Sequence, residues 1–182
     1  MSQQNEQFDE IFDVLVVGSG CGGLTAALTA DIAAPAKVLV IEKSHLIGGT
    51  SATSGGVIWI PDNHLGKEKG AEDSIAEAKQ YLQATIPEDE FNEPLIDTYL
   101  DQGPKMVKFM EDNTDARYTS LEHYPDYFQD APGVKLGNRA LEPLPVSADT
   151  LDDDVDNLHP SGPQTIVFGR YGVNFEESHA FT

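Results

Sequence analysis

A glycine-rich turn constrains this chain more than any other feature. The run before it, residues 12–17, is apolar and β-branched and predicts a buried parallel strand. Residues 22–34 are rich in Ala and Leu and predict a helix that Pro35 stops, and residues 37–41 predict a second buried strand. The turn joins the first strand to the helix with the spacing G-x-G-x-x-G and consists of Gly18, Ser19, Gly20, Cys21, Gly22 and Gly23. Together these parts predict one βαβ unit.

The turn has the chemistry of a dinucleotide site. Gly18 permits a tight turn, Gly20 lets the backbone approach a pyrophosphate, and Gly23 lets the helix pack closely on the strand. The helix N-terminus offers free N–H groups and a positive dipole to the phosphates. Glu42 directly follows the second strand, where its carboxylate can accept hydrogen bonds from a ribose hydroxyl and would repel a 2′-phosphate. We interpret Cys21 as a small turn residue, because a redox thiol would need a partner that the chain lacks.

A second glycine cluster favours FAD over NAD. Residues 48–56 combine glycines with four hydroxyl side chains and come shortly after the ribose-binding strand. Their small side chains and flexible backbone can lie along a diphosphate and a flavin ring, and the apolar residues 57–60 indicate that the loop is anchored. The predicted cofactor-binding residues of this segment are Gly49, Thr50, Ser51, Ser54, Gly55 and Gly56.

Helices are expected after this loop. Residues 73–85 have an amphipathic pattern, with Asp73 or Ser74 as the cap. A second helix begins at Pro94 and is interrupted at Gly103-Pro104, and a third, short helix covers residues 106–110.

The remainder of the chain is expected to be irregular. Residues 113–164 are rich in proline and acidic residues and are predicted to be loop-like, and a helix is expected to begin over 175–181. One βαβ unit does not complete a dinucleotide-binding sheet, so we expect an N-terminal portion of a longer protein. The expected organisation is a polar tail over 1–10 and the N-terminal part of an FAD-binding domain over 11–182. That part divides into 11–61, the βαβ unit with the flavin loop, and 62–182, its helical and loop-rich continuation.

Composition excludes several classes of partner. The 182 residues include 31 acidic and 11 basic side chains, a net charge of −20 that repels nucleic acid and anionic membranes. The single cysteine indicates a reducing compartment, and no apolar run has the length of a membrane span. The first ten residues lack the pattern of a secretion signal, so we expect a cytoplasmic protein. The five histidines show no metal-ligand spacing, so no metal site is expected.

The motifs resemble those of a known flavoprotein superfamily. Residues 13–20, the strand end at Glu42-Lys43 and the loop 48–56 are similar to the fumarate reductase and succinate dehydrogenase flavoproteins. Within that group, G-G-T-S-x-x-S-G followed by residues 58–61 resembles the 3-ketosteroid Δ1-dehydrogenases and their Δ4 relatives, and the likeness returns at 124–128 and 137–139. The resemblance implies an α/β, Rossmann-like FAD-binding fold of the glutathione-reductase type with a helical and loop-rich excursion. It also implies that Lys43 lies among the cofactor-binding residues.

The resemblance implies a reaction. A steroid-like ketone would lose a proton beside the carbonyl to a tyrosinate-like base and a hydride to the flavin, and an electron acceptor would reoxidise the flavin. Tyr127 falls on a supporting active-site tyrosine of that family, whereas the principal base and the substrate domain lie beyond residue 182. Read without the family, Tyr127 would more often be a core aromatic residue. Gly49 stands where membrane-bound succinate dehydrogenases carry a flavin-linked histidine, which implies a non-covalent FAD.

Two other functions stay open at this point. A reductase of fumarate or another enoate would need arginines for its carboxylate substrate, and the chain has only Arg117, Arg139 and Arg170. A non-catalytic dinucleotide-binding module is the third interpretation.

Overall fold

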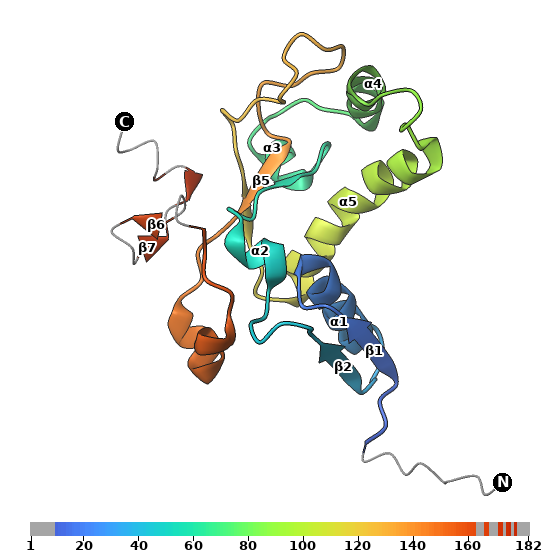
Figure 1. Ribbon diagram of the computed structural model, residues 1–182. Helices are drawn as coiled ribbons and strands as arrows, with labels where there is room; N and C mark the ends of the chain where they lie inside the picture. Colours follow the sequence, from blue (N-terminus) through green and yellow to red (C-terminus); the bar gives the residue numbers. More distant parts are fainter. Residues whose placement is uncertain (1–9, 163–165, 168–170, 173, 176, 178–182) are drawn as a thin grey trace, which may run out of the picture. The chain divides into compact units, whose positions relative to one another are not determined.

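The computed structural model describes residues 10–162, 166–167, 171–172, 174–175 and 177 (Figure 1). These residues belong to two compact units. The first lies within 1–54 and 148–164, and the second lies within 55–147 and 165–182. In this described part of the chain, no helix is long and apolar enough to cross a membrane.

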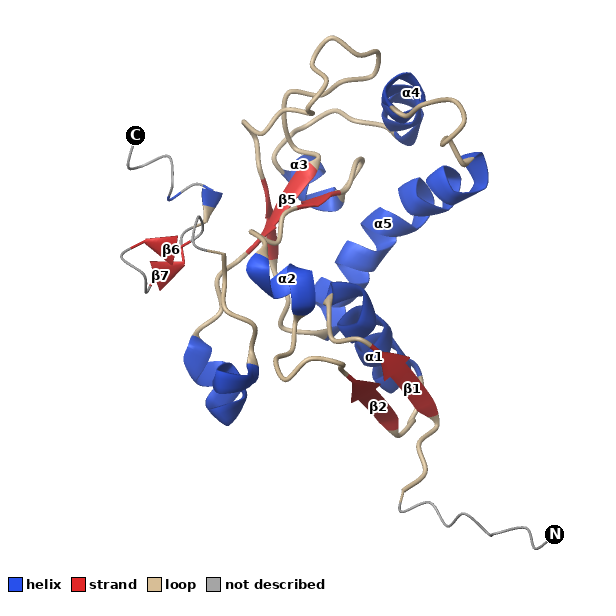
Figure 2. Ribbon diagram, viewed as in Figure 1, coloured by secondary structure: helices blue, strands red, loops and turns tan. Residues whose placement is uncertain are grey.

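The first unit contains the predicted βαβ arrangement. Strand β1 (Val14–Val17) leads through the glycine turn into helix α1 (Cys21–Ala33), and strand β2 (Val38–Ile41) follows. The two strands pair in parallel, with Val14 opposite Val38 and Val17 opposite Ile41. Helix α1 packs on one face of this strand pair (Figure 2). The sequence prediction is confirmed for both strands and for the helix.

Strand β1 is less buried than expected. Successive side chains of a strand point to opposite faces, and α1 covers only one of them. Val16 faces the helix, whereas Leu15 and Val17 are 58% and 77% exposed. Within this chain, the prediction of a strand buried on both faces is therefore wrong for the second face.

Two segments expected to be loops contain helical turns in the first unit. The glycine cluster includes a short helix, α2 (Gly49–Thr53), and the acidic run forms a 3₁₀ helix, η1 (Ala148–Asn157). Ile47 joins the two segments, because its N–H donates to Asn157 and its carbonyl accepts from His159. Residues about a hundred positions apart are thus neighbours, and no local pattern could indicate that pairing.

The second unit is built on a small antiparallel sheet. Strand β5 (Ala140–Pro143) lies between β3 (Ile58–Trp59) and β4 (Tyr118–Ser120), and β6 (Ile166–Val167) pairs with β7 (Tyr171–Gly172). The prediction that 113–164 is loop-like is wrong at β4 and β5. These strands are too short for a period-2 pattern to emerge, and their pairing partners are distant in sequence.

Three described helices belong to the same unit as this sheet. They are α3 (His64–Glu68), which was not expected, α4 (Ile75–Thr85) and α5 (Glu93–Asn113). The predicted cap of α4 is confirmed at Ser74, whose Oγ accepts a hydrogen bond from the N–H of Glu77 at 3.2 Å.

The predicted interruption at Pro104 is wrong. Helix α5 continues through it from Glu93 to Asn113. The loss of one backbone hydrogen bond is offset by packing, because Leu100, Gly103, Val107 and Met110 form one buried face on both sides of the proline. A Cβ at Gly103 would lie 3.3 Å from Ile60 Cδ1, so the absence of a side chain lets the helix approach the sheet.

The core of the second unit lies between α5 and the sheet. Ile60, Val107 and Leu141 are buried at its centre, and partly buried residues pack around them: Ile58, Leu65, Met106 and Tyr118. Of the helix expected over 175–181, Phe175 and Glu177 are helical, and the N–H of Glu177 donates to Asn174 Oδ1 at 2.7 Å. The other residues of that prediction lie outside the described part of the chain.

We predict that α5 contributes to stability through its buried face. Leu100 is fully buried, so Leu100→Ala is expected to lower the free energy of unfolding by about 2–5 kcal/mol. Leu95→Ala is the matched control on the same helix, because Leu95 is 65% exposed and should change stability by roughly 0.5 kcal/mol or less. Urea unfolding measures both variants, and equal losses would contradict this packing.

Candidate functional site

The glycine turn has the geometry that an anion-binding helix N-terminus requires. Gly18 has a φ of +100°, which favours glycine, and its N–H donates to the carbonyl of Ile41 at 2.7 Å. Gly20 is the N-cap residue of α1, so no cap side chain covers the first N–H groups. The hydroxyl of Ser51 accepts from the N–H of Cys21 at 3.0 Å. The side chain that bonds to the N-terminus of α1 is therefore a neutral hydroxyl.

Gly23 is the glycine that the fold most needs. A Cβ there would lie 1.9 Å from the carbonyl oxygen of Gly18, whereas a Cβ at Gly22 would meet nothing within 4 Å. At Gly20, the nearest atom to a Cβ would be Ser51 Oγ at 3.6 Å, so protein atoms leave this position accessible. The expected structural roles of Gly18 and Gly23 are confirmed, and the approach of a pyrophosphate at Gly20 stays a prediction.

Glu42 lies directly after β2, beside the turn. Its Oε2 accepts hydrogen bonds from the Ser19 hydroxyl at 2.7 Å and the Ser19 N–H at 3.0 Å, and its Oε1 accepts from the Ser44 N–H at 3.0 Å. These bonds, led by the Ser19 hydroxyl, lower the pKa of Glu42 to about 2. The carboxylate is therefore ionised at neutral pH, and its remaining lone pairs can accept ribose hydroxyls.

Ser19 links Glu42 to the second glycine segment. It is only 2% exposed, and its hydroxyl also accepts from the N–H of Gly48 at 2.9 Å. Sequence reasoning placed Ser19 in the turn but did not find this link, because the bond joins residues 29 positions apart.

The second glycine segment is locally ordered by its own hydroxyls. In the first unit, Thr53 Oγ1 donates to the carbonyl of Thr50, and Ser54 Oγ donates to the carbonyl of Ser51, both at 3.0 Å. Gly49 has a φ of +50°. In the second unit, Gly56 has a φ of +73°, and a Cβ there would lie 2.8 Å from Pro143 Cγ. Gly55 and Lys43 are exposed.

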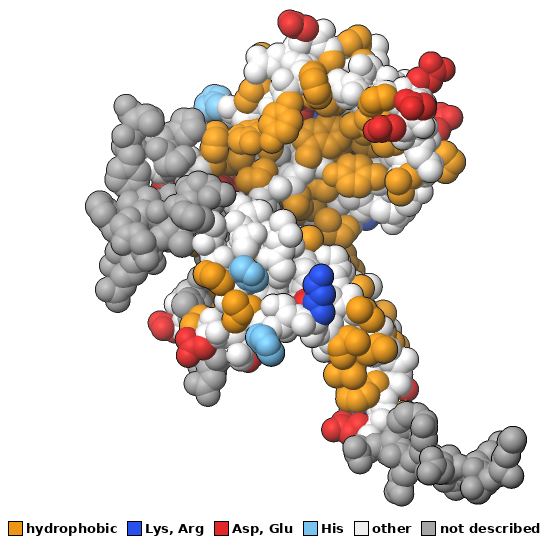
Figure 3. Space-filling model, in the orientation of Figure 1, with side chains coloured by type: hydrophobic (Ala, Val, Ile, Leu, Met, Phe, Trp, Pro, Cys, Tyr) orange, Lys and Arg blue, Asp and Glu red, His pale blue; other side chains and the backbone are white. Residues whose placement is uncertain are grey.

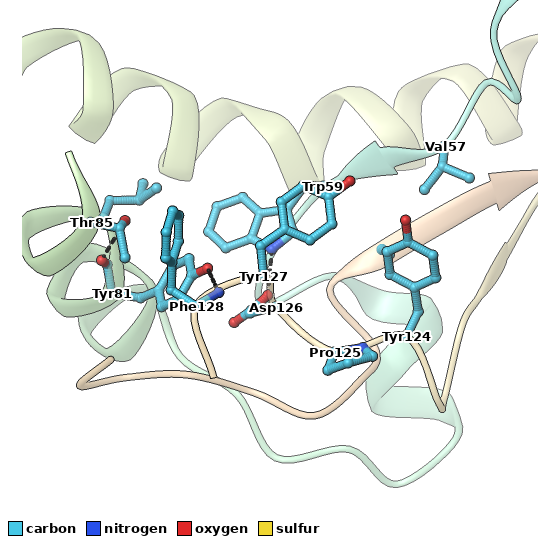
Figure 4. Close-up of a pocket in the computed structure, with 11 residues that line it drawn as sticks. Val57, Trp59, Tyr81, Thr85, Tyr124, Pro125, Asp126, Tyr127 and Phe128 are labelled. Atoms are coloured by element: carbon cyan, nitrogen blue, oxygen red, sulfur yellow. Dashed lines mark hydrogen bonds between the residues drawn. The ribbon is translucent and has the colours of Figure 1, made fainter. Parts of the chain in front are cut away.

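A separate apolar pocket lies within the second unit. Its volume is about 330 Å³, and Figure 4 shows the side chains around it. Apolar side chains also gather on the molecular surface over α4 and α5 of this unit (Figure 3). The pocket is lined by Val57, Trp59, Tyr81, Leu82, Thr85, Tyr124, Pro125, Asp126, Tyr127, Phe128 and Ala140.

Two tyrosines place hydroxyl groups in this apolar pocket. Figure 4 shows the hydroxyls of Tyr124 and Tyr127 at the end of the pocket near Val57. The Tyr127 side chain, followed by desolvation, raises the pKa of the Tyr124 phenol, so Tyr124 is protonated at neutral pH. Tyr127 is 80% exposed, which contradicts the interpretation of this residue as a core aromatic.

Asp126, between the two tyrosines, points away from the pocket opening into a buried network. Its Oδ1 accepts from Trp59 Nε1 at 2.7 Å, and its Oδ2 accepts from Arg139 Nη1 at 2.8 Å and the Lys135 N–H at 2.9 Å. Sequence reasoning did not find Trp59, Tyr81 or Arg139 as neighbours of this segment. The contacts span 13 to 67 positions, and no local periodicity encodes them.

The arginines of the described residues are already bonded. Arg139 pairs with Asp73 and Asp126, and Arg117 donates to the carbonyls of Thr114 and Ala116. Arg170 lies outside the described residues. The pocket has apolar walls and tyrosine hydroxyls, which can donate hydrogen bonds to the oxygen of a ketone. Among the described residues, its lining contains no Lys or Arg.

Comparison with known proteins decides which cofactor this geometry serves. A family model described as FAD binding domain matches residues 13–150, which is most of the chain. The chain belongs to the FAD binding domain family.

The chain is similar to dehydrogenases whose names describe oxo compounds. The chain is 40% identical over 94% of its length to a 4-oxocyclohexanecarboxylate 2-dehydrogenase of Sinomonas cyclohexanicum. It is 42% identical over 82% of its length to a 3-oxosteroid 1-dehydrogenase of Mycolicibacterium smegmatis. The chain spans 29% and 26% of the lengths of these two proteins.

A solved structure shares the fold. The 3-ketosteroid Δ1-dehydrogenase of Sterolibacterium denitrificans, in complex with 1,4-androstadiene-3,17-dione, aligns with a TM-score of 0.84 at 38% identity. The alignment covers 93% of this chain and 29% of that protein. The predicted fold class and the resemblance to 3-ketosteroid dehydrogenases are confirmed.

FAD is the cofactor of this family, as the two glycine segments predicted. The residues of the first unit suit it, because a helix end that meets only a neutral hydroxyl, a glycine-rich turn and an ionised carboxylate are the partners that a dinucleotide needs. The individual contacts predicted for residues 18–23, Glu42, Lys43 and the 49–56 segment stay predictions.

We predict that FAD binding by this family member requires glycine at position 23. Gly23→Ala places a Cβ 1.9 Å from the carbonyl oxygen of Gly18, and overpacking of this kind costs roughly 1–3 kcal/mol. We expect FAD affinity to fall by about 10- to 100-fold, because each 1.4 kcal/mol is a factor of ten. Gly22→Ala, which adds the same methyl group in open space, is the control. Flavin titration of the full-length protein measures both, and equal affinities would refute the role of Gly23.

A second prediction concerns acid stability. The pKa of Glu42 is about 2 when folded and 4.5 ordinarily, so its stabilising contribution is complete above pH 4.5 and is lost as the pH falls towards 2. Ser19→Ala removes the largest cause, and the pKa of Glu42 should rise towards 4.5. Ser51→Ala removes a hydroxyl that does not contact Glu42 and is the control. An NMR titration of the Glu42 carboxyl tests this, and an unchanged pKa in Ser19→Ala would show that Ser19 does not set it.

Proposed function

We propose that the full-length protein is an FAD-dependent dehydrogenase that introduces a C=C bond into the ring of a 3-ketosteroid. The observation that carries this proposal is the apolar pocket in which Tyr124 and Tyr127 present hydroxyls. Its occurrence in a member of the FAD binding domain family, with similarity to 3-oxosteroid 1-dehydrogenases over most of the chain, supports the same reaction.

The reaction removes a proton and a hydride from two adjacent ring carbons. The electrons of one C–H bond form the new C=C bond when its proton leaves beside the ketone, and the neighbouring carbon loses a hydride. When bound, FAD would supply the hydride acceptor, and a separate electron acceptor would take up the two electrons. We assign the principal base to a part of the protein beyond residue 182.

Tyr127 has a supporting role in this proposal. The residue is exposed, and its hydroxyl can donate a hydrogen bond to the substrate or to the base. The Asp126 carboxylate does not compete for the hydroxyl, because Trp59, Arg139 and Lys135 already donate to it.

A second candidate substrate is a single-ring keto acid. The similarity to a 4-oxocyclohexanecarboxylate 2-dehydrogenase favours it, since that substrate also has a ring ketone. A carboxylate needs a cationic partner, however, and both described arginines, Arg117 and Arg139, are bonded elsewhere. The same observation disfavours a fumarate or enoate reductase. Assays with a 3-ketosteroid and with 4-oxocyclohexanecarboxylate separate the two dehydrogenases, and FAD binding without turnover of either would indicate a non-catalytic module.

We further propose that FAD is bound non-covalently in a cytoplasmic protein. Gly49 has no side chain that could bond the flavin at the position where the succinate dehydrogenases carry histidine. The single cysteine, Cys21, is free and exposed, which suits a reducing compartment.

We predict that Tyr127→Phe lowers turnover by about 100-fold or more, the scale of a general acid–base contribution. The substitution removes only the hydroxyl, so flavin content and melting temperature should match the wild type. Tyr118→Phe is the control, because Tyr118 lies in β4 and does not line the pocket. The assay is steady-state oxidation of a 3-ketosteroid with an artificial electron acceptor, normalised to flavin released by acid precipitation. Turnover within a few-fold of the wild type would remove Tyr127 from the mechanism.

A further inference from the structure

We propose that Arg139 is a positioning residue that holds Tyr124 and Tyr127 in place at the pocket. The proposal rests on the dehydrogenase function proposed above, since it assigns to Arg139 the placement of the hydroxyls that the reaction uses.

Arg139 is clamped between two carboxylates inside the second unit. It is 1% exposed, and its guanidinium makes three short hydrogen bonds. Nε and Nη2 donate to the two oxygens of Asp73 at 2.9 and 2.7 Å, and Nη1 donates to Asp126 Oδ2 at 2.8 Å. The rings of Trp59 and Tyr81 lie 5.5 and 5.9 Å from the guanidinium. A planar fork of this kind fixes direction as well as distance, which a lysine cannot reproduce.

The Asp126 end of this clamp controls the tyrosine segment. Asp126 directly precedes Tyr127 and is 5% exposed. Its N–H donates to the carbonyl of Lys135, and its Oδ2 accepts from the Lys135 N–H. Tyr127 itself is 80% exposed, so core packing does not hold its ring. The position of the Tyr127 hydroxyl therefore depends on the backbone, and Arg139 anchors that backbone through a charged, bidentate-held guanidinium.

The Asp73 end anchors the clamp to α4. Asp73 accepts from the N–H groups of Asp62 and Ser74, and Ser74 caps the helix. The same helix carries Tyr81, whose hydroxyl accepts from the N–H of Phe128 at 3.1 Å. The pocket segment is thus tied to one rigid helix at two points.

The charge of the clamp argues that stability alone does not explain it. Asp73 and Asp126 contribute two negative charges and Arg139 contributes one positive charge, so the buried group keeps a net charge of −1. Apolar residues of the same volume generally stabilise a protein as well as a buried ion pair or better. A directional anchor for a catalytic segment is a function that apolar packing would not supply.

The test uses Arg139→Lys and Arg139→Gln in the full-length protein. We expect kcat per bound flavin to fall by about 10- to 100-fold with KM within threefold, because small misplacement of a catalytic group has costs of this size. Arg139→Lys should retain more turnover than Arg139→Gln. Lys79→Met is the control, since Lys79 anchors α4 to Glu93 and Asp97 of α5 without contacting the pocket segment.

A second measurement is independent of activity. In protein labelled with 3-fluorotyrosine, the ¹⁹F resonances of Tyr124 and Tyr127 are assigned with the two Tyr→Phe variants. Both resonances should shift in the Arg139 variants and stay unchanged in Lys79→Met. If Arg139→Gln does not fold, Arg139→Lys and Asp73→Asn carry the test.

The outcomes are separable. Wild-type kcat in Arg139→Lys, or unshifted tyrosine resonances, would overturn the positioning role and leave Arg139 as a structural residue. A wild-type protein that oxidises no ring ketone would overturn the proposed function, and the ¹⁹F spectra would still show whether Arg139 fixes the two tyrosines.

Discussion

The contact between Gly23 and the carbonyl of Gly18 is the constraint on which the cofactor site depends. Helix α1 can begin at the end of β1 only because no side chain separates these two backbones. Next to this close approach, Ser19 is buried and its hydroxyl donates to the carboxylate of Glu42. One missing methyl group thereby allows the N-terminus of α1 and the ionised carboxylate of Glu42 to lie at the same edge of the strand pair.

Polar groups in the two units are organised by different physical means. In the first unit, neutral hydroxyls and backbone N–H groups surround one partly buried carboxylate, Glu42, and keep it ionised. In the second unit, the buried guanidinium of Arg139 neutralises one of two carboxylates and ties the pocket segment to α4. The first arrangement leaves room for a ligand that binds by hydrogen bonds, and the second builds a wall that presents tyrosine hydroxyls.

Similarity to both a keto-acid dehydrogenase and steroid dehydrogenases has a plain chemical basis. The names of both relatives describe dehydrogenases of ring compounds that carry an oxo group, and we propose that the apolar pocket of this chain faces such a ring. Discrimination between a neutral polycyclic ketone and a small anion needs a cation at the far end of the substrate. The proposal of a neutral substrate rests on the two described arginines, Arg117 and Arg139, which are engaged in structural bonds.

The sequence by itself determined the βαβ unit, its glycine turn, the place of Glu42 and the choice of FAD. Each of these depends on residues adjacent in the chain, where glycine spacing and apolar periodicity report directly on backbone geometry. The sequence did not reveal that α5 runs through Pro104, because packing of Leu100 and Val107 on the sheet outweighs the local break.

Only the tertiary structure decided the surroundings of the tyrosines. Strands β4 and β5 form because β5 pairs with β4 on one side and with β3 on the other. Asp126 bonds to Trp59 and Arg139, which lie 67 and 13 positions away in the sequence. Read without the family, Tyr127 is expected to be a core aromatic residue, yet it is 80% exposed, whereas Asp126 beside it is buried. Such contacts follow from how distant segments fill one volume, and that information is absent from any local pattern.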